Sequence, residues 1–409
     1  MNKIQKRWVL ILSVVLAVIL ILTFTANSII SSKADSFLRN KLAATDTSSY
    51  IIDFGSLRVN IFTRSVKVFD ISIKQTEAAF ENLRTNKHAP IGFEANIERI
   101  KIGRVGIFDA LEGKSLDIGS VVVSEPLITV YSPEGMFPEK HKQKREETES
   151  QPDSSSKLPM DEAFIGNIRI IDGMVRWIDM RNEERVMDVS LLNVEMDDVH
   201  VHHPGDDSLS FILDTEELNI MLNSMSMVLP GKLYTLKTDR LDISYKDKQV
   251  SLDSLRLIPA YSKSRFGQIV GKQTDRFDLK IANILLSGIE FDSIFNKKAI
   301  ISKVTLTGPS ADIYRDKGIP RDMNHFPKLY QTAIAQLPIL LDISVVEIID
   351  GMVDYQEKVE WSTMAGGVTF EDFDITISGI SNDKEKINNG LAMRVDATAI
   401  LMGKADLEL

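Results

Sequence analysis

The sequence predicts a mainly β protein, in which one N-terminal transmembrane helix precedes an elongated, repeated and twisted antiparallel β-sheet with few short helices. Three observations lead to this fold class. An apolar stretch opens the chain, apolar and polar residues alternate along most of the remainder, and one long strand-rich segment occurs twice.

The apolar stretch at the N-terminus predicts a membrane anchor. Lys3 and Arg7 precede the uncharged segment Trp8–Ser32, and about 20 apolar residues suffice to cross the hydrocarbon core of a bilayer. A cleaved signal peptide is the competing interpretation, but Phe24 stands where a cleavage site needs a small residue. We therefore expect a retained, single-pass anchor. The residues expected along it are Trp8, Leu12, Leu16, Leu20, Phe24 and Ile30.

The short N-terminal tail favours a cytoplasmic N-terminus, with the chain from Ser32 onward translocated across the membrane. Residues 1–45 then form a first segment, which holds the cytoplasmic tip, the anchor and an exit helix beginning near Asp35.

Alternation with a period of two dominates the chain after the anchor. Val66 and Val68 flank Lys67, and the same pattern recurs at many places, for example at Ile375–Ile377. Strict alternation is typical of strands with one apolar and one polar face, and the frequent Val, Ile and Thr in these segments suit strands.

The sequence contains an internal repeat. The six residues Ile170–Val175 recur unchanged as Ile348–Val353. Upstream, Phe93–Pro126 aligns with Phe277–Pro309 with one gap. Repetition of a strand-rich unit indicates an elongated stack. We expect a first repeat over residues 46–276 and a second, incomplete repeat over 277–409.

The repeat continues downstream, where Val189–Val201 aligns with Val368–Ile380. Between its conserved parts the two copies differ. Residues 138–159 are charged and serine-rich, which predicts a disordered loop, whereas the second copy has a predicted helix at His325–Leu337 in that place. The last strand, near Ala392–Leu401, is expected to leave an unpaired edge open to a protein partner or a further domain.

Composition and motifs argue against several classes of protein. The chain has no cysteine and a net charge of -10 with scattered basic residues, so we expect no nucleic-acid partner. It has no phosphate loop, nucleophile elbow or HExxH motif. We therefore expect no enzyme, no cofactor and no metal.

Two sets of polar residues are candidate sites. His200, His202 and His203 lie among acidic residues, but a zinc site needs a second fixed pair of ligands, and a polar strand end explains the histidines equally well. Asp172 and its repeat Asp350 each precede a glycine, which is first a turn signal and predicts a repeated hairpin.

Three segments resemble the AsmA-like superfamily of bacterial envelope proteins, which includes TamB-like members. They are Asp53–Ile73, Ile97–Tyr131 and Asn167–Asp179, together with the N-terminal anchor. The resemblance implies an anchor in the cytoplasmic (inner) membrane with the bulk of the chain in the periplasm. It also implies a long twisted sheet curled into an apolar groove that carries phospholipid acyl chains, in maintenance of the outer membrane.

Alternation cannot tell a groove that exposes its apolar stripe from a closed core that buries it. The resemblance favours the groove. The alternative is a non-enzymatic structural or assembly-assisting periplasmic scaffold with a closed β core. Residues expected to line the groove are Val68, Ile102, Ile118, Val123, Val130, Ile170, Ile243, Leu257, Leu306, Ile348 and Ile375.

Overall fold

A computed structural model describes residues 27–40, 49–105, 116–133, 135–136, 162–202, 212–215, 217–323 and 330–409. Strands account for 62% and helices for 14% of this part of the chain, so the protein is mainly β. The chain divides into two compact units, Met1–Glu184 with Asn193–Glu216 and Arg185–Leu192 with Glu217–Leu409. The expected repeat boundary at residue 276 lies inside a strand of the second unit.

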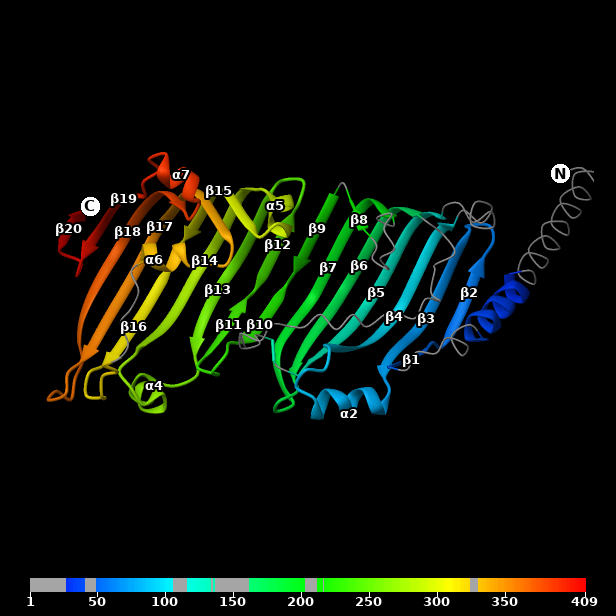
Figure 1. Cartoon of the computed structure of the whole chain (residues 1–409), viewed down its shortest axis with the longest axis horizontal. Helices are drawn as coiled ribbons and strands as arrows, with labels where there is room; N and C mark the ends of the chain where they lie inside the picture. The colour runs from blue at the N-terminus through cyan, green and yellow to red at the C-terminus, as the bar shows by residue number, and fades with distance from the viewer. Residues whose placement is uncertain are drawn as a thin grey trace, which may run out of the picture. The chain divides into compact units, whose positions relative to one another are not determined.

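The first unit is built from long neighbouring strands (Figure 1). Residues 27–40 form a helix ahead of them. The other elements are β1 (Tyr50–Asp53), β2 (Ser56–Asn60), β3 (Ser65–Gln75), α2 (Glu77–Thr85), β4 (Gly92–Val105), β5 (Leu116–Ser132), β6 (Glu162–Asp179), β7 (Glu184–His202), which contributes residues to both units, and β8 (Ile212–Asp214).

The second unit also consists mainly of strands. Its strands are β9 (Glu217–Leu222), β10 (Ser224–Val228), β11 (Tyr234–Thr238), β12 (Arg240–Ser244), β13 (Gln249–Pro259), β14 (Asp275–Ile289), β15 (Lys298–Thr307), β16 (Ser310–Asp316), β17 (Leu340–Lys358), β18 (Gly366–Ser381), β19 (Arg394–Leu401) and β20 (Ala405–Glu408). Its helices are α4 (Lys263–Val270), α5 (Phe291–Phe295), α6 (Tyr330–Ala335) and α7 (Lys384–Asn388).

The sheet is mixed, so the expectation of a purely antiparallel sheet was wrong. β5 and β6 pair in parallel, as do β15 with β17 and β16 with β17. Parallel neighbours need a crossover of a dozen residues or more. The long connections are the ones that follow Ser132 and Asp316, at the places where the two repeats differ in sequence. The second connection contains α6, while the predicted disordered loop at 138–159 lies outside the described residues.

The Asp-Gly pairs do not form hairpins, which corrects the sequence interpretation. Asp172 lies inside β6 and Asp350 inside β17, and both adopt left-handed backbone angles with φ of 54° and 57°. The backbone N–H of Asp172 donates to Asn193 Oδ1 at 3.1 Å, and that of Asp350 to Asp374 Oδ1 at 2.9 Å. Aspartate tolerates this conformation. The register of β17 against β18 shifts on both sides of Gly351, so Asp350 and Gly351 form a β-bulge, and Asp172 has the same backbone angle and the same kind of hydrogen bond at the equivalent position of β6.

Left-handed residues also correct the downstream alignment of the repeats. Leu191 and Asp198 of β7 have positive φ, as do Asp372 and Gly379 of β18. When these positions are matched, each residue of β7 corresponds to a residue of β18 that lies two positions later than in the sequence alignment.

The helix at residues 27–40 lies along the edge strand β2. Ser31 Oγ accepts from the N–H of Val59 at 2.8 Å and donates to its carbonyl at 3.3 Å, while Asn27 Oδ1 accepts from the N–H of Ile61 at 3.1 Å. At the break between β1 and β2, Arg39 donates to the carbonyls of Phe54 and Gly55. These bonds satisfy backbone groups that an edge strand otherwise exposes.

The expected membrane anchor lies almost wholly outside the described residues. Trp8, Leu12, Leu16, Leu20 and Phe24 belong to that part of the chain, and Ile30 is in the helix at 27–40 with 40% of its surface exposed. Among the described helices, none is long and apolar enough to cross a membrane.

The strand expected at the C-terminal edge is paired on both sides, so that expectation was wrong for Arg394–Leu401. β19 pairs with β18 and with β20, both antiparallel. Met402 and Gly403 are the central residues of the turn between β19 and β20, and both have positive φ. The N–H of Lys404 donates to the carbonyl of Leu401 at 3.0 Å, and this tight turn places β20 beside β19.

Candidate functional site

Apolar side chains form continuous rows across neighbouring strands of the first unit. Residues that face each other in the register of adjacent strands lie on the same side of a sheet. One such row joins Val68 on β3, Ile100 on β4, Val123 on β5 and Ile170 on β6. Parallel and antiparallel pairs thus contribute to a single apolar face.

Further rows on this face run beside the first. One joins Val66, Ile102, Val121 and Ile168, and another joins Ile118 with Ile165. Near the opposite strand ends, Phe93, Val130 and Trp177 are register partners.

The second unit carries the same kind of rows over more strands. They are Leu241–Leu252–Ile284–Leu306–Ile348–Ile375, Ile243–Val250–Leu286–Val304–Val346–Ile377 and Leu236–Leu257–Leu279–Ala311–Val353–Phe370.

The structure therefore places every expected groove residue on the apolar face of its unit. All of them are half-buried, with side chains neither enclosed nor fully exposed. The residues concerned are Val68, Ile102, Ile118, Val123, Val130 and Ile170 in the first unit and Ile243, Leu257, Leu306, Ile348 and Ile375 in the second.

Left-handed residues keep these rows in phase. Along β3 the apolar residues are Val66 and Val68 and then Ile71 and Ile73, so the alternation shifts by one residue between the two pairs. Asp70, with φ of 54°, lies at this shift. Arg104 on β4, Glu125 on β5 and Asp172 on β6 also have positive φ, and each lies where the alternation of its strand shifts by one residue. The registers of β3, β4, β5 and β6 are the same before and after these residues. The side-chain direction therefore changes on neighbouring strands together, and the apolar side chains stay on one face.

The opposite face is polar and carries cross-strand ion pairs. Arg169 Nε lies 2.8 Å from Glu195 Oε1 in the first unit, and Lys303 Nζ lies 2.7 Å from Glu347 Oε2 in the second. Tyr131 also lies on this face, where burial and a hydrogen bond to Glu94 raise its pKa to about 12. The two faces of the sheet therefore differ sharply in chemistry.

Few apolar side chains are enclosed in the described part of the chain. Twelve hydrophobic residues are buried there, including Ile71, Val199 and Phe266. In a β-sandwich the inner faces of two sheets bury each other's apolar residues, but the described strands of each unit are paired with one another as neighbours in a sheet. Half-buried rows of this kind are an accessible apolar surface, and such surfaces mark binding sites.

One end of the apolar face in the first unit is covered. Ala34 and Leu38, from the helix at 27–40, pack with a buried cluster formed by Phe54, Leu57 and Ile71. The same cluster contacts Val66 and Val68 of β3. The helix that follows the expected anchor thus lies against the first strands of the apolar face.

The other candidate residues have local structural roles. His200 stacks on Phe164 with ring centroids 4.3 Å apart, and His203 lies outside the described residues. Within the described ranges no cluster of three metal-ligating side chains is found. Asp172 and Asp350 are the left-handed residues of β6 and β17 described above. Among the tryptophans, Trp177 lies in an apolar row, whereas Trp361 is 87% exposed beyond the end of β17.

Compared with known proteins, the sequence matches no family model and no curated protein.

Proposed function

We propose that this protein is a membrane-anchored, non-enzymatic lipid-binding protein that holds or transfers phospholipid acyl chains along the apolar face of its sheet. The observation that carries the proposal is the set of half-buried apolar rows, which run across neighbouring strands in each unit. An acyl chain is a linear apolar ligand, so continuous apolar rows offer it contact without requiring a specific hydrogen bond.

The N-terminus supports the same function. The predicted anchor leads into the helix at 27–40, which packs on the first strands of the apolar face through Ala34 and Leu38. A lipid that leaves a bilayer beside the anchor would meet this end of the face first. The AsmA-like resemblance fits this arrangement, with the anchor in the cytoplasmic membrane and the sheet in the periplasm.

A structural scaffold with a closed core is the alternative function. It requires the apolar rows to be covered, and a covered row would contain enclosed side chains. The half-burial of residues such as Val123 and Ile348 favours the open face.

A matched pair of substitutions on one strand tests the proposal. Val123 faces the apolar side of β5, and Thr129 faces Glu94 on the polar side. In the full chain, we expect Val123→Asp to lower the amount of co-purified phospholipid several-fold while the protein stays folded. Thr129→Asp should leave the lipid content unchanged. A second pair, in the second unit, is Ile348→Asp and Ile349→Asp.

The closed scaffold predicts a different result. An unpaired carboxylate enclosed in a core should unfold the protein, so Val123→Asp would then lose its cooperative melting transition. The proposal is overturned if that happens and the parent protein carries no lipid.

Trp177 provides a direct readout of contact with acyl chains. With Trp8→Phe and Trp361→Phe, it becomes the sole tryptophan of the chain. Phosphatidylcholine with brominated acyl chains should quench its emission in detergent solution, because bromine quenches tryptophan at short range. Unchanged emission at saturating lipid would contradict binding along this face.

A further inference from the structure

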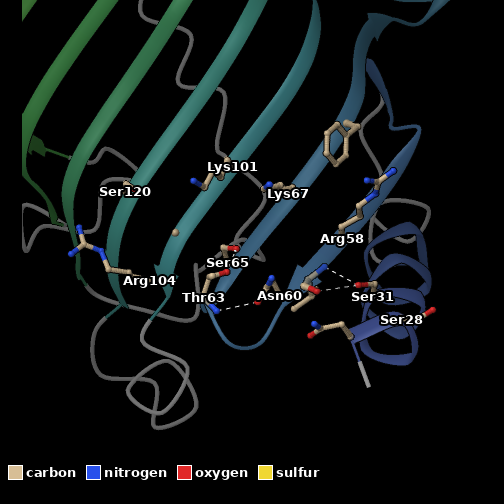
Figure 2. Close-up of a pocket in the computed structure, with 14 residues that line it drawn as sticks. Ser28, Ser31, Arg58, Asn60, Thr63, Ser65, Lys67, Lys101, Arg104 and Ser120 are labelled. Carbon is tan, nitrogen blue, oxygen red and sulfur yellow. Dashed lines mark hydrogen bonds between the residues drawn. The ribbon is translucent and has the colours of Figure 1, made fainter. Parts of the chain in front are cut away.

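A basic cavity of about 780 Å³ lies in the first unit, apart from the apolar face. Arg58 on β2, Lys67 on β3, and Lys101 and Arg104 on β4 line it (Figure 2). No acidic residue is among the described residues that line it. The volume lies within the range of about 300–1,000 Å³ that is typical of small-molecule pockets.

The register of the strands brings three of these cations together. Arg58 is the partner of Lys67, and Lys67 is the partner of Lys101, so they form one row on the polar face of the sheet. Figure 2 shows Lys67 between the other two side chains. Like charges directly opposite each other destabilise a pair of strands, so the row is unfavourable unless a negative charge lies nearby.

The described part of the chain supplies no carboxylate to these cations. Arg58 lies over the ring of Phe69 at 5.0 Å, and Arg104 contacts the carbonyl of Gly119 at 3.5 Å. By contrast, Arg169 and Lys303 on the same kind of surface each have a carboxylate partner. The cavity therefore has uncompensated positive charge among the described residues.

Neutral polar groups form most of the remaining wall of the cavity, together with Val59, Phe69 and Gly103. Side chains with hydroxyl or amide groups come from the helix at 27–40, from the β2–β3 turn and from β5. They are Asn27, Ser28, Ser31, Asn60, Thr63, Ser65 and Ser120. Cationic and hydroxyl groups together suit phosphate oxygens, which accept several hydrogen bonds at once.

The second unit shows that the fold does not require these cations. Through the shared registers, its strands β12, β13 and β14 correspond to β2, β3 and β4. At the positions of the three cations in the row, the second unit has Asp242, Ser251 and Leu285. Gly288 stands in place of Arg104. The same strand frame is thus built without any of the four positive charges.

We propose that this cavity binds a phosphate group, either as the headgroup of an anionic phospholipid or as free phosphate. Its basic row is held beside the helix that follows the predicted anchor. Binding neutralises the like charges on β2, β3 and β4, so the ligand stabilises the first unit. The cavity lies on the polar face, so this inference does not depend on acyl chains binding to the apolar rows.

Two ligands without acyl chains test the site and separate its two sources. The full chain is titrated by calorimetry at low ionic strength with inorganic phosphate and with glycerophosphoglycerol, the deacylated headgroup of phosphatidylglycerol. Tighter binding of glycerophosphoglycerol identifies a lipid headgroup as the ligand. Equal or tighter binding of inorganic phosphate identifies free phosphate. Absence of binding by both overturns the proposal.

Charge-neutral variants identify the residues that bind. Lys67→Gln with Lys101→Gln should weaken binding by about tenfold or more, because two charge-assisted hydrogen bonds are lost. Lys74→Gln with Lys87→Gln is the matched control, since both lysines are exposed and neither lines the cavity. Equal weakening in both variants would indicate a general charge effect and overturn the site.

Thermal unfolding provides a second measurement. Without ligand, the Lys67→Gln and Lys101→Gln variant should melt at a higher temperature than the parent, because repulsion within the row is relieved. Phosphate should raise the melting temperature of the parent and leave that of the variant unchanged. A parent protein that phosphate does not stabilise contradicts the proposal.

Discussion

The two repeats share one face of their sheet and differ on the other. Val123 and Ile170 in the first repeat have counterparts in Leu306 and Ile348, and both pairs are parallel partners. On the polar face, Lys101 corresponds to Leu285. The apolar rows, the crossovers and the left-handed residues therefore belong to the frame that both repeats share, whereas the side chains of the polar face differ between them.

Glu98 and Glu125 show how far the polar faces have diverged. A hydrogen bond and the charge of Glu98 are the main causes that raise the pKa of Glu125. The corresponding residues of the second repeat are Ala282 and Gly308, and a Cβ on Gly308 would lie 3.3 Å from that of Ala282. The same two backbone positions are thus close together in both repeats, but they carry two carboxylates in the first repeat and no charged side chain in the second.

The largest effect is expected where the second repeat packs an aromatic ring on a glycine. A Cβ on Gly351 would lie 2.2 Å from two ring atoms of Phe373, its register partner. Gly351→Ala should therefore lower the free energy of unfolding by about 1–3 kcal/mol, measured by denaturant unfolding. Gly366→Ala is the control, because its Cβ would meet no atom within 4 Å.

A second substitution makes this region resemble the first repeat. Matching the left-handed residues of β7 and β18 places Leu192 where the second repeat has Phe373. In the Gly351→Ala background, Phe373→Leu should recover part of the lost stability, because the ring no longer occupies the site of the new Cβ. If the double variant is no more stable than Gly351→Ala, the contact with the ring is not the cause.

An intermediate effect is expected at the hydrogen bond to the backbone of each left-handed aspartate. Asp374→Ala removes the acceptor for the N–H of Asp350 and should cost about 1 kcal/mol of unfolding free energy. Asp374→Asn should cost less than about 0.5 kcal/mol, because Asn193 fills this role for Asp172 in the first repeat. Chemical denaturation of both variants gives the comparison, and equal losses would contradict it.

The smallest effect is expected at Glu125. Because its pKa in the folded protein is raised above the ordinary value of 4.5, the folded state holds its proton more tightly than the unfolded chain does. The resulting stabilisation is present below pH 4.5 and is lost as the pH rises through the raised pKa.

Glu125→Gln removes this pH dependence. The melting temperature of the variant should exceed that of the parent slightly at neutral pH, and the difference should shrink or reverse in acid. A difference that stays constant across this pH range would contradict the interaction with Glu98.

Alternation in the sequence predicts the strands and the apolar face because each step of a strand reverses the side-chain direction. The shifts in alternation at Asp70, Asp172 and Asp350 were not predicted, since a left-handed residue within a strand depends on packing with neighbouring strands. The parallel pairing could have been predicted from the length of the connections after Ser132 and Asp316, because antiparallel neighbours are usually joined by short turns.

The basic cavity shows the limit of prediction from alternation. Lys67 and Lys101 each occupy an ordinary polar position between apolar neighbours. Their meeting depends on the register of β3 against β4, and a shift of one residue would move them to the other face. The docking of the helix at 27–40 against β2 places further polar groups at the same cavity.

The bonds from Asn27 and Ser31 to β2 also set the direction in which such a sheet can lengthen. Their side chains form hydrogen bonds with backbone groups of Val59 and Ile61. The edge of β2 therefore has fewer free backbone groups with which another strand could pair, whether that strand comes from a duplicated segment or from another molecule. Gene duplication would therefore lengthen the sheet on the far side of β3. A copied repeat that contains its own left-handed aspartate would place its apolar side chains on the same face of the sheet as those of the original repeat.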